Sequence, residues 1–358
     1  MPLVSHNDLP AFERLRREGQ IVLSPGRAAH QDIRELHIGL LNMMPDTALA
    51  ATERQFFRLV GESNPIAQFY MHPFTFEQLP RSDTALGYVN QYYESFELLR
   101  EQGLDALIIT GANVTGSNLS DEPFWAPLRE VIEWACQSVT SILCSCLATH
   151  AVLEFRYGQT RRRLPDKCWG VFPHRVMESS HPLVHDVNSV FDVPHSRFND
   201  ISRTQFEAAG VHVLVESEEA GVHLGTSTDG FRMVYFQGHP EYDTISLLKE
   251  YKREVGRFAR RERGDYPPLP DNYFGVKEQA ILEEYRERLI LTLKRGVALP
   301  EFPEGLISPA IDNTWHDTAE AIVGNWIGKV YQVTHQDRKR PFMDGVDPEN
   351  PLGLETIR

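Results

Sequence analysis

Apolar runs alternate with amphipathic stretches through the first half of the chain, beginning near residue 37. Contiguous apolar segments of this length are typical of strands that are buried on both faces of a parallel sheet. We predict such strands over residues 37–44, 66–72, 106–110 and 141–146. Helices are predicted over 47–59 and 92–102, and again where apolar residues follow helical spacing at Leu128, Val131, Ile132 and Ala135. Strands that alternate with helices indicate an α/β fold with a doubly wound, mostly parallel sheet.

Short β-like runs replace this alternation between residues 169 and 236, and turn residues separate them. They predict an antiparallel section that belongs to the same sheet. Further helices are expected over 242–258, 278–295 and 318–333, with a proline-rich linker over 266–270. These patterns divide the chain into an N-terminal arm (1–35), a main domain (36–260) and a helical C-terminal extension with its tail (261–358).

The composition excludes several classes of function. A formal net charge of −14 opposes attraction to nucleic acid phosphates, so no nucleic acid partner is expected. No apolar run approaches the roughly twenty residues of a membrane span. The N-terminus lacks a signal-peptide pattern, so we expect a cytoplasmic protein without a membrane partner. Four unevenly spaced cysteines fit reduced thiols, and no Cys/His cluster has zinc-ligand spacing, so no metal is predicted.

Cys146 lies where the apolar run 141–146 meets a helix-like stretch. A side chain on a strand-to-helix turn is lifted clear of the sheet, and a helix N-terminus favours a thiolate over a thiol. The backbone N–H groups of Leu147 and of Ala112, in the loop after the third strand, are the expected donors to an oxyanion. These features favour Cys146 as a nucleophile, whereas the other three cysteines fit packing roles.

His239 and Glu241 follow another strand-like run, within the segment Gln237-Gly238-His239-Pro240-Glu241. Residues two apart in an extended chain share a face, so Glu241 can orient His239 while His239 takes the thiol proton. Together with Cys146 they suggest a Cys-His-Glu acyl-transfer site. One alternative from another class stays open, a non-catalytic binding module in which Cys146 packs in the core.

Six ordered segments of the chain resemble the homoserine O-acyltransferases of the succinyltransferase type. The resemblance covers roughly residues 35–260 and continues more weakly over 315–331. The segments are 41–45, 110–112, 145–148, Lys167 with 170–172, 194–198 and 238–243. This family is built like a class I glutamine amidotransferase, so the resemblance implies a flavodoxin-like, amidotransferase-like catalytic domain over 36–260. It also implies an enzyme of methionine biosynthesis that acylates the hydroxyl of L-homoserine.

The resemblance implies a role for each residue of the suggested site. Cys146 matches the acyl-thioester nucleophile, His239 the general base, and Glu241 the residue that orients the base. A thioester donor and a thiolate acceptor differ little in energy, so an acyl group can pass reversibly from coenzyme A to Cys146 and then to homoserine, in ping-pong fashion. The acyl-coenzyme A is a cosubstrate, so no cofactor is expected. The family further suggests a homodimer.

Four other residues match positions that contact substrate in the family, or lie beside them. Lys167 and Ser196 match substrate contacts, and Arg253 falls where a helix of the family offers a basic residue to the carboxylate of the amino acid. Arg197 lies beside Ser196, and its guanidinium can serve either as a carboxylate clamp or as one half of a structural ion pair.

The choice of acyl group is expected to depend on Thr115. In the family that the chain resembles, glycine at this position goes with succinyl and glutamate with acetyl, and Thr115 is neither. Thr115 carries no carboxylate, which leaves room for a dicarboxylic acyl group and favours succinyl-CoA. Acetyl-CoA as donor and serine as acceptor stay open, as does a glutamine amidotransferase-like cysteine hydrolase, although Ser145 and Leu147 stand where those enzymes usually carry glycine. The basic cluster 161–163 is a candidate contact for the phosphates of coenzyme A.

Overall fold

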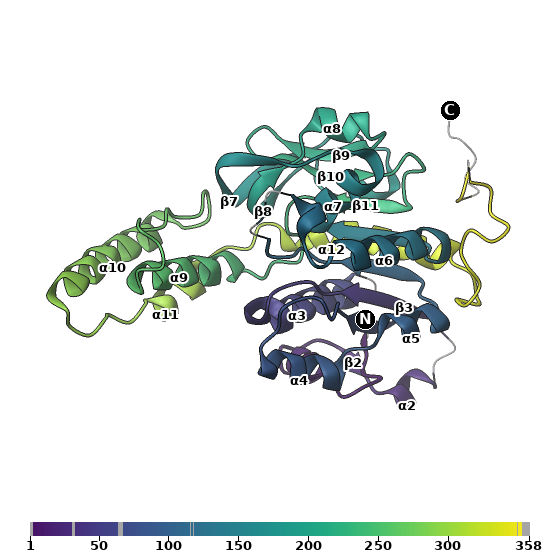
Figure 1. Ribbon diagram of the computed structural model, residues 1–358, viewed down its shortest axis with the longest axis horizontal. Helices are drawn as coiled ribbons and strands as arrows, with labels where there is room; N and C mark the ends of the chain where they lie inside the picture. The colour runs from purple at the N-terminus through teal and green to yellow at the C-terminus, as the bar shows by residue number, and fades with distance from the viewer. Residues whose placement is uncertain are drawn as a thin grey trace.

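The computed structural model describes residues 3–30, 33–63, 67–114, 116, 118–348 and 350–352. Within these residues, eleven strands form one sheet in the order β2-β1-β4-β3-β5-β6-β11-β10-β9-β7-β8 (Figure 1). Six of the neighbouring pairs are parallel and four are antiparallel. The predicted α/β fold, with a mostly parallel sheet and an antiparallel section, is therefore confirmed.

Five parallel strands form the centre of this sheet. They lie side by side in the order β4-β3-β5-β6-β11, which is the strand order of doubly wound, flavodoxin-like folds. Ligands bind such sheets beyond the carboxyl ends of the strands. The strands β6 and β11 are hydrogen-bonded neighbours, so the segments that follow them begin at the same edge. The five strands are β3 (Glu35–Leu41), β4 (Gln68–Phe74), β5 (Ala106–Ile109), β6 (Ser141–Ser145) and β11 (Met233–Phe236).

The antiparallel section contains longer strands than the sequence pattern indicated. β7 is 15 residues long and pairs with β8, although only 171–172 stood out as strand-like within it. Charged residues such as Asp166 and Lys167 interrupt the apolar pattern because the first half of β7 is largely exposed. The strands of this section are β7 (Arg162–Val176), β8 (Val190–Asp200), β9 (His212–Ser217) and β10 (Gly221–Thr226).

Helices cover both faces of the parallel strands. Buried side chains of α1, α3 and α12 pack with Leu36, Ile38 and Leu40 of β3 on one face. Side chains of α5, α6, α7 and α8 pack on the other face, against residues that include Leu41 and Leu107. The apolar stripe predicted around Leu128 is buried in α6. The helices are α1 (Pro10–Arg17), α3 (Asp46–Glu62), α5 (Phe96–Gln102), α6 (Trp125–Ser138), α7 (Leu147–Tyr157), α8 (Arg203–Ala208) and α12 (His316–Val333).

The helix predicted over 92–102 is confirmed from Phe96 to Gln102, but its predicted start was wrong, because Tyr92 is the last residue of a separate helix. α4 (Asp83–Tyr92) ends first, and two non-helical residues, Tyr93 and Glu94, separate it from Ser95, the N-cap of α5. The hydroxyl of Ser95 accepts a hydrogen bond from the Leu98 N–H at 3.2 Å and caps the second helix. A serine that satisfies a free N–H group at this position starts a new helix.

The N-terminal residues take part in the sheet. β1 (Leu3–Val4) pairs in parallel with β4 and with β2 (Val22–Leu23), and both residues of β1 are buried. The helix α1 then packs its buried side chains against α3 in the same apolar cluster, and α2 (Pro25–Ala28) follows β2. A strand of two residues has no detectable alternation, so the sequence pattern could not predict β1.

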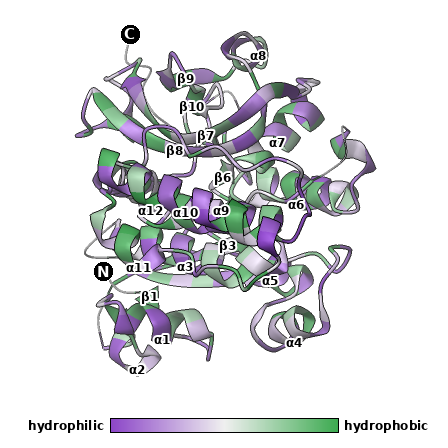
Figure 2. Ribbon diagram, turned by 90° about the vertical axis from the view of Figure 1, so that its left-hand side faces the viewer, coloured by the Kyte–Doolittle hydropathy of each residue, from purple (hydrophilic) through white to green (hydrophobic). Residues whose placement is uncertain are grey.

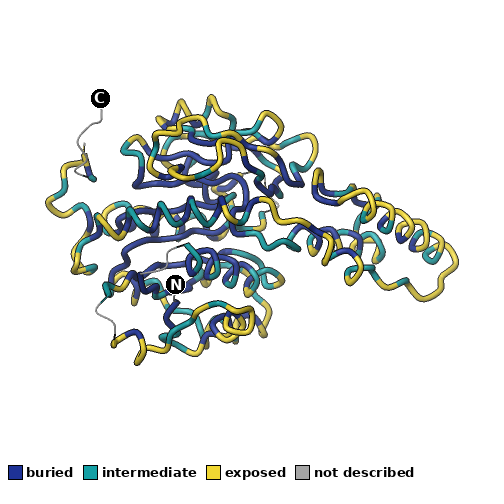
Figure 3. The backbone as a smooth tube through the Cα atoms, turned by 180° about the vertical axis from the view of Figure 1, so that it is seen from behind, coloured by how far each residue is buried: buried dark blue, intermediate teal, exposed yellow. Residues whose placement is uncertain are grey.

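A pair of helices projects from the body of the molecule beyond β7 (Figure 1). α9 (Ser246–Ala259) and α10 (Val276–Arg295) form it together with the short α11 (Glu304–Ile307). Their apolar stripes, visible as green segments in Figure 2, form a third cluster that includes Trp169 of β7. Figure 3 shows that this projection is mostly exposed, whereas the central strands are buried. No helix within the described residues is long and apolar enough to cross a membrane.

Candidate active site

Cys146 occupies the turn between β6 and α7, with φ 52° and ψ −109°. Such a positive φ is strained for a residue that carries a side chain. The last residue of β11 holds the turn, because the Phe236 carbonyl accepts hydrogen bonds from Cys146 N and from the Thr149 hydroxyl, both at 2.8 Å. The side chain is partly exposed, so this turn presents the thiol at the carboxyl edge of the sheet.

The other three cysteines have different surroundings. All four are free thiols, but Cys144 is fully enclosed in β6, and burial raises the pKa of its thiol well above the usual range. Burial also raises the pKa of Cys136 and of Cys168. A raised pKa leaves little thiolate near neutral pH, so these three residues are poor nucleophiles.

His239 and Glu241 lie together just beyond β11. Nδ1 of His239 is 2.8 Å from Oε1 of Glu241, and the two side chains are 9% and 5% exposed. Burial acts to lower the pKa of His239, but the Glu241 carboxylate and the negative charge of a Cys146 thiolate outweigh it and raise that pKa well above its ordinary value. The Tyr242 ring stacks on the imidazole with centroids 4.3 Å apart. Within the described residues, Nε2 makes no hydrogen bond of standard geometry, so it is left to interact with the thiol.

The loop that follows β5 approaches the Cys146 turn closely. A Cβ atom added at Gly111 would lie 3.6 Å from the Cβ of Cys146 and 3.8 Å from the backbone N of Leu147. Leu147 is the first residue of α7, so its N–H has no acceptor within the helix. The N–H of Ala112 likewise has no hydrogen-bond acceptor in the described part of the chain. The two donors expected from the sequence therefore belong to segments that meet beside the thiol.

Lys167 and Ser196 meet at a carboxylate that the sequence analysis missed, that of Glu250 in α9. Lys167 Nζ lies 3.0 Å from Oε2, the Ser196 hydroxyl donates to the same oxygen at 2.6 Å, and the Tyr242 hydroxyl donates to Oε1 at 2.6 Å. Burial acts to raise the pKa of Glu250, but the charge of Lys167 and these hydrogen bonds lower it. Because Glu250 follows Lys167 by 83 positions, no local spacing could have paired them.

Two arginines predicted to contact substrate differ in their surroundings. Arg253 lies on α9, one turn after Glu250, and its side chain is about half exposed. Burial is the main cause that lowers the pKa of Lys167, and the positive charge of Arg253 adds to it, so the two cations lie near each other. Arg197 is buried and donates to Asp200 Oδ1 at 2.8 Å and to two backbone carbonyls. Of the two roles left open for Arg197, these contacts fit the structural ion pair.

The basic cluster 161–163 does not form one surface. The Nη2 atom of Arg161 donates to the Gly116 carbonyl at 2.9 Å, whereas Arg162 pairs with Asp200 at 3.2 Å. Arg163 lies over the ring of Phe198, 5.3 Å from its centroid. These three directions do not fit a shared contact with coenzyme A phosphates. Thr115, predicted to influence the acyl group, lies outside the described residues.

Comparison with known proteins places the chain in a family. The family model described as homoserine O-succinyltransferase matches residues 2–336. The protein of that name from Allochromatium vinosum is 69% identical over 354 residues, which cover 99% of each chain. This chain belongs to the homoserine O-succinyltransferase family. Its relatives of the same name from Nitrosococcus oceani and Thiobacillus denitrificans are each 67% identical over 99% of this chain, and over 99% and 100% of their own chains.

The resemblance found in the sequence is thus confirmed at the level of the family. Among solved structures, a glutamine amidotransferase from Thermotoga maritima is similar with a TM-score of 0.45 and 10% identity, over 84% of this chain and 99% of that one.

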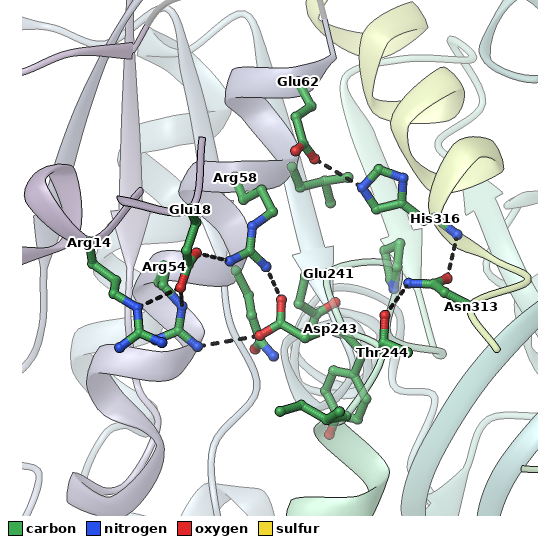
Figure 4. A pocket seen from close by; sticks show the side chains of 15 residues that line it. Arg14, Glu18, Arg54, Arg58, Glu62, Glu241, Asp243, Thr244, Asn313 and His316 are labelled. Carbon is green, nitrogen blue, oxygen red and sulfur yellow. Dashed lines mark hydrogen bonds and ion pairs between the residues drawn. The ribbon is translucent and has the colours of Figure 1, made fainter. Parts of the chain in front are cut away.

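Ion pairs with α3 hold the segment that carries His239 and Glu241. Asp243 pairs with Arg58 and, at 3.3 Å, with Arg54, and both arginines belong to α3 (Figure 4). These residues line a cavity of about 390 Å³ whose wall includes Glu241. The sequence analysis included Asp243 in a family segment without assigning it a role. Its contacts tie the segment after β11 to the helix after β3.

Proposed function

We propose that this chain transfers a succinyl group from succinyl-CoA to the hydroxyl of L-homoserine through a thioester on Cys146. The observation that carries the proposal is the placement of Cys146 on a strained strand-to-helix turn beside the hydrogen-bonded pair His239 and Glu241. The relatives that are 67–69% identical over almost the whole chain are named homoserine O-succinyltransferase. Their name also favours succinyl over acetyl as the acyl group.

The first half-reaction would load the enzyme. The Cys146 thiol gives its proton to Nε2 of His239, and the sulfur attacks the carbonyl carbon of succinyl-CoA. The Leu147 and Ala112 N–H groups stabilise the tetrahedral oxyanion. Removal of one such donor typically lowers the rate by about a hundredfold or more. The bond from carbon to the coenzyme A sulfur then breaks, and His239 returns the proton to that sulfur. Glu241 stabilises the imidazolium while it holds the proton.

The second half-reaction would use the same groups in the reverse sense. His239 accepts the proton of the homoserine hydroxyl, and the oxygen attacks the succinyl thioester on Cys146. The bond from carbon to the Cys146 sulfur breaks, and the proton passes from His239 to that sulfur. O-succinylhomoserine leaves, and the free enzyme is restored with both charges and protons as at the start.

The charged groups beside this centre suit an amino acid as acceptor. Lys167 and the half-exposed Arg253 supply positive charge for the carboxylate of homoserine. Glu250 holds Lys167 and Ser196 in place through its hydrogen bonds, so we assign it a positioning role.

Steady-state kinetics with crossed substrates tests the proposal. Succinyl-CoA and acetyl-CoA are each combined with homoserine and with serine, and initial rates are measured at several concentrations of both substrates. We expect the highest kcat/KM for succinyl-CoA with homoserine, and parallel double-reciprocal lines because the first product leaves before the acceptor reacts. Cys144→Ser is the matched control and keeps activity, whereas Cys146→Ser abolishes it. Intersecting lines, or turnover by Cys146→Ser, would contradict the thioester route. Hydrolysis of glutamine in place of acyl transfer would contradict the proposed activity itself.

A further inference from the structure

A second cluster of chemically competent side chains lies away from Cys146, where the N-terminal segment meets β4. It consists of His6, just after β1, His72 in β4 and Glu94, between α4 and α5. One ligand atom from each lies within 4.8 Å of the others. His72 Nδ1 is 2.7 Å from Glu94 Oε1, and His6 Nε2 is 4.0 Å from the same oxygen. These three side chains are 6–19% exposed, so the cluster is enclosed but within reach of solvent.

The contacts behind this cluster need one proton more than two neutral imidazoles supply. Glu35, His37, His72 and Glu94 form a row with three contacts, at 3.2, 2.8 and 2.7 Å. Each contact joins two electronegative atoms and therefore needs one proton or another cation between them. Two neutral imidazoles carry only two protons, and both ends of the row are carboxylates. The third contact thus needs either an additional proton or a metal ion.

The ring nitrogens that face Glu94 are arranged as they are in metal sites. Nδ1 of His6 lies 3.1 Å from the Val4 carbonyl, an acceptor that fixes its proton there and leaves the lone pair of Nε2 toward Glu94. Nε2 of His72 lies 2.8 Å from Nδ1 of His37. When His72 carries its proton on Nε2 and donates it to His37, the lone pair of His72 Nδ1 faces Glu94 as well. Two histidines oriented by partners on their other nitrogen, with one carboxylate, form a typical ligand set for zinc.

Binding of an ion would bring the three ligand atoms closer to equal spacing, and the atoms of His6 and His72, which lie within 4.8 Å of each other, would approach by up to about 1.5 Å. Tetrahedral ligands about 2.0–2.1 Å from a zinc ion lie roughly 3.3 Å from one another. The 2.7 Å contact between His72 and Glu94 would widen, and the 4.0 Å contact between His6 and Glu94 would shorten, each by well under 1 Å. The Asn7 amide, 3.4 Å from His6 Nε2, would have to release that nitrogen.

We propose that His6, His72 and Glu94 bind one divalent transition-metal ion of the zinc class, with a fourth position left for water. The ion would take the place of the proton between His72 and Glu94, so that His72 and His37 donate their protons along the row toward Glu35. It would join the N-terminal segment, β4 and the connection between α4 and α5. The ligands come from positions 6, 72 and 94, so no sequence spacing could have indicated the site.

Metal titration of the full chain tests this proposal. Zn²⁺ is titrated calorimetrically into untagged protein that carries Cys146→Ser, so that the thiolate does not compete for the ion, and Co²⁺ is then used as an absorbing probe of ligand geometry. We expect one equivalent of Zn²⁺ to bind, and the visible spectrum of a four-coordinate Co²⁺ that Zn²⁺ displaces. His6→Ala and Glu94→Gln should each weaken Zn²⁺ binding by at least about tenfold.

The controls separate this site from adventitious binding. His185→Ala removes an exposed histidine outside the cluster and should bind Zn²⁺ as the parent does. Glu94→Gln keeps a hydrogen-bond acceptor for His72, so its fold, checked by the midpoint of thermal unfolding, should persist if His6→Ala proves unstable. Absence of saturable binding would show that a proton completes the row. Equal affinity in the parent, His6→Ala and Glu94→Gln would place the ion elsewhere.

Discussion

Replacing Glu241 by glutamine removes one charge from the candidate site and little else. The two side chains have similar size, and an amide oxygen can still accept a hydrogen bond from Nδ1 of His239. The stacked Tyr242 ring remains to hold the imidazole in place. The substitution therefore tests whether the carboxylate charge itself supports His239.

The size of the effect follows from the contact. The His239–Glu241 hydrogen bond is 2.8 Å long and nearly excluded from solvent. A hydrogen bond to a charged group contributes about 1.5–3 kcal/mol. A hydrogen bond between neutral groups contributes about 0.5–1.5 kcal/mol. Exchanging the charged acceptor for a neutral one therefore removes about 1–1.5 kcal/mol, which at 1.36 kcal/mol for each unit lowers the pKa of His239 by about one unit. If the imidazolium is equally important in the transition state, kcat/KM falls about tenfold.

Two measurements check this prediction. Initial rates with succinyl-CoA and homoserine give kcat/KM, and the ring protons of His239, followed by NMR from pH 5 to 10, give its pKa. Glu218→Gln makes the same chemical change at an exposed position between β9 and β10 and should alter neither quantity. Turnover of Glu241→Gln within about twofold of the parent, together with an unchanged pKa of His239, would refute the reasoning.

Two further substitutions test the surroundings of the site and the core. Asp243→Asn removes the charge that Arg54 and Arg58 hold, so the segment after β11 should loosen, and kcat should fall about tenfold with KM for homoserine unchanged; an unchanged kcat would contradict this positioning role. Burial raises the pKa of Glu53 to about 7, although the hydrogen bond from Tyr88 opposes this shift. The folded state therefore favours the protonated carboxyl. The resulting stability is present below pH 4.5 and is lost as the pH rises through 7, by up to about 3 kcal/mol. Urea unfolding at pH 5 and pH 8 should show this loss in the parent and not in Glu53→Gln, and equal pH dependence in both proteins would contradict it.

The central strands and the position of Cys146 were predictable because their signals are local. A run of apolar residues that is buried on both faces is recognisable from a few positions, and the helix that begins after Cys146 follows directly. The edge of a parallel sheet then brings such strand ends together, so the meeting of the segments after β6 and β11 follows from the topology.

Other features escaped prediction because they depend on contacts between distant segments. Glu250 acquires its importance from Lys167 and Ser196, which approach it only after α9 has packed beside β7. No strand was predicted over the charged first half of β7, because it has no apolar pattern and joins the sheet through the pairing of Arg162 and Arg163 with β8, followed by an irregularity before Cys168. His6 and His72 likewise come together only through the pairing of β1 with β4.

Mass spectrometry of the protein after incubation with succinyl-CoA alone tests the central claim most directly. Without homoserine the second half-reaction cannot proceed, so the account predicts that the chain gains about 100 Da, the mass of one succinyl group. Peptide mapping should place this adduct on Cys146, and addition of homoserine should remove it with release of O-succinylhomoserine. An adduct on Cys144, or active protein that never acquires an adduct, would contradict the account.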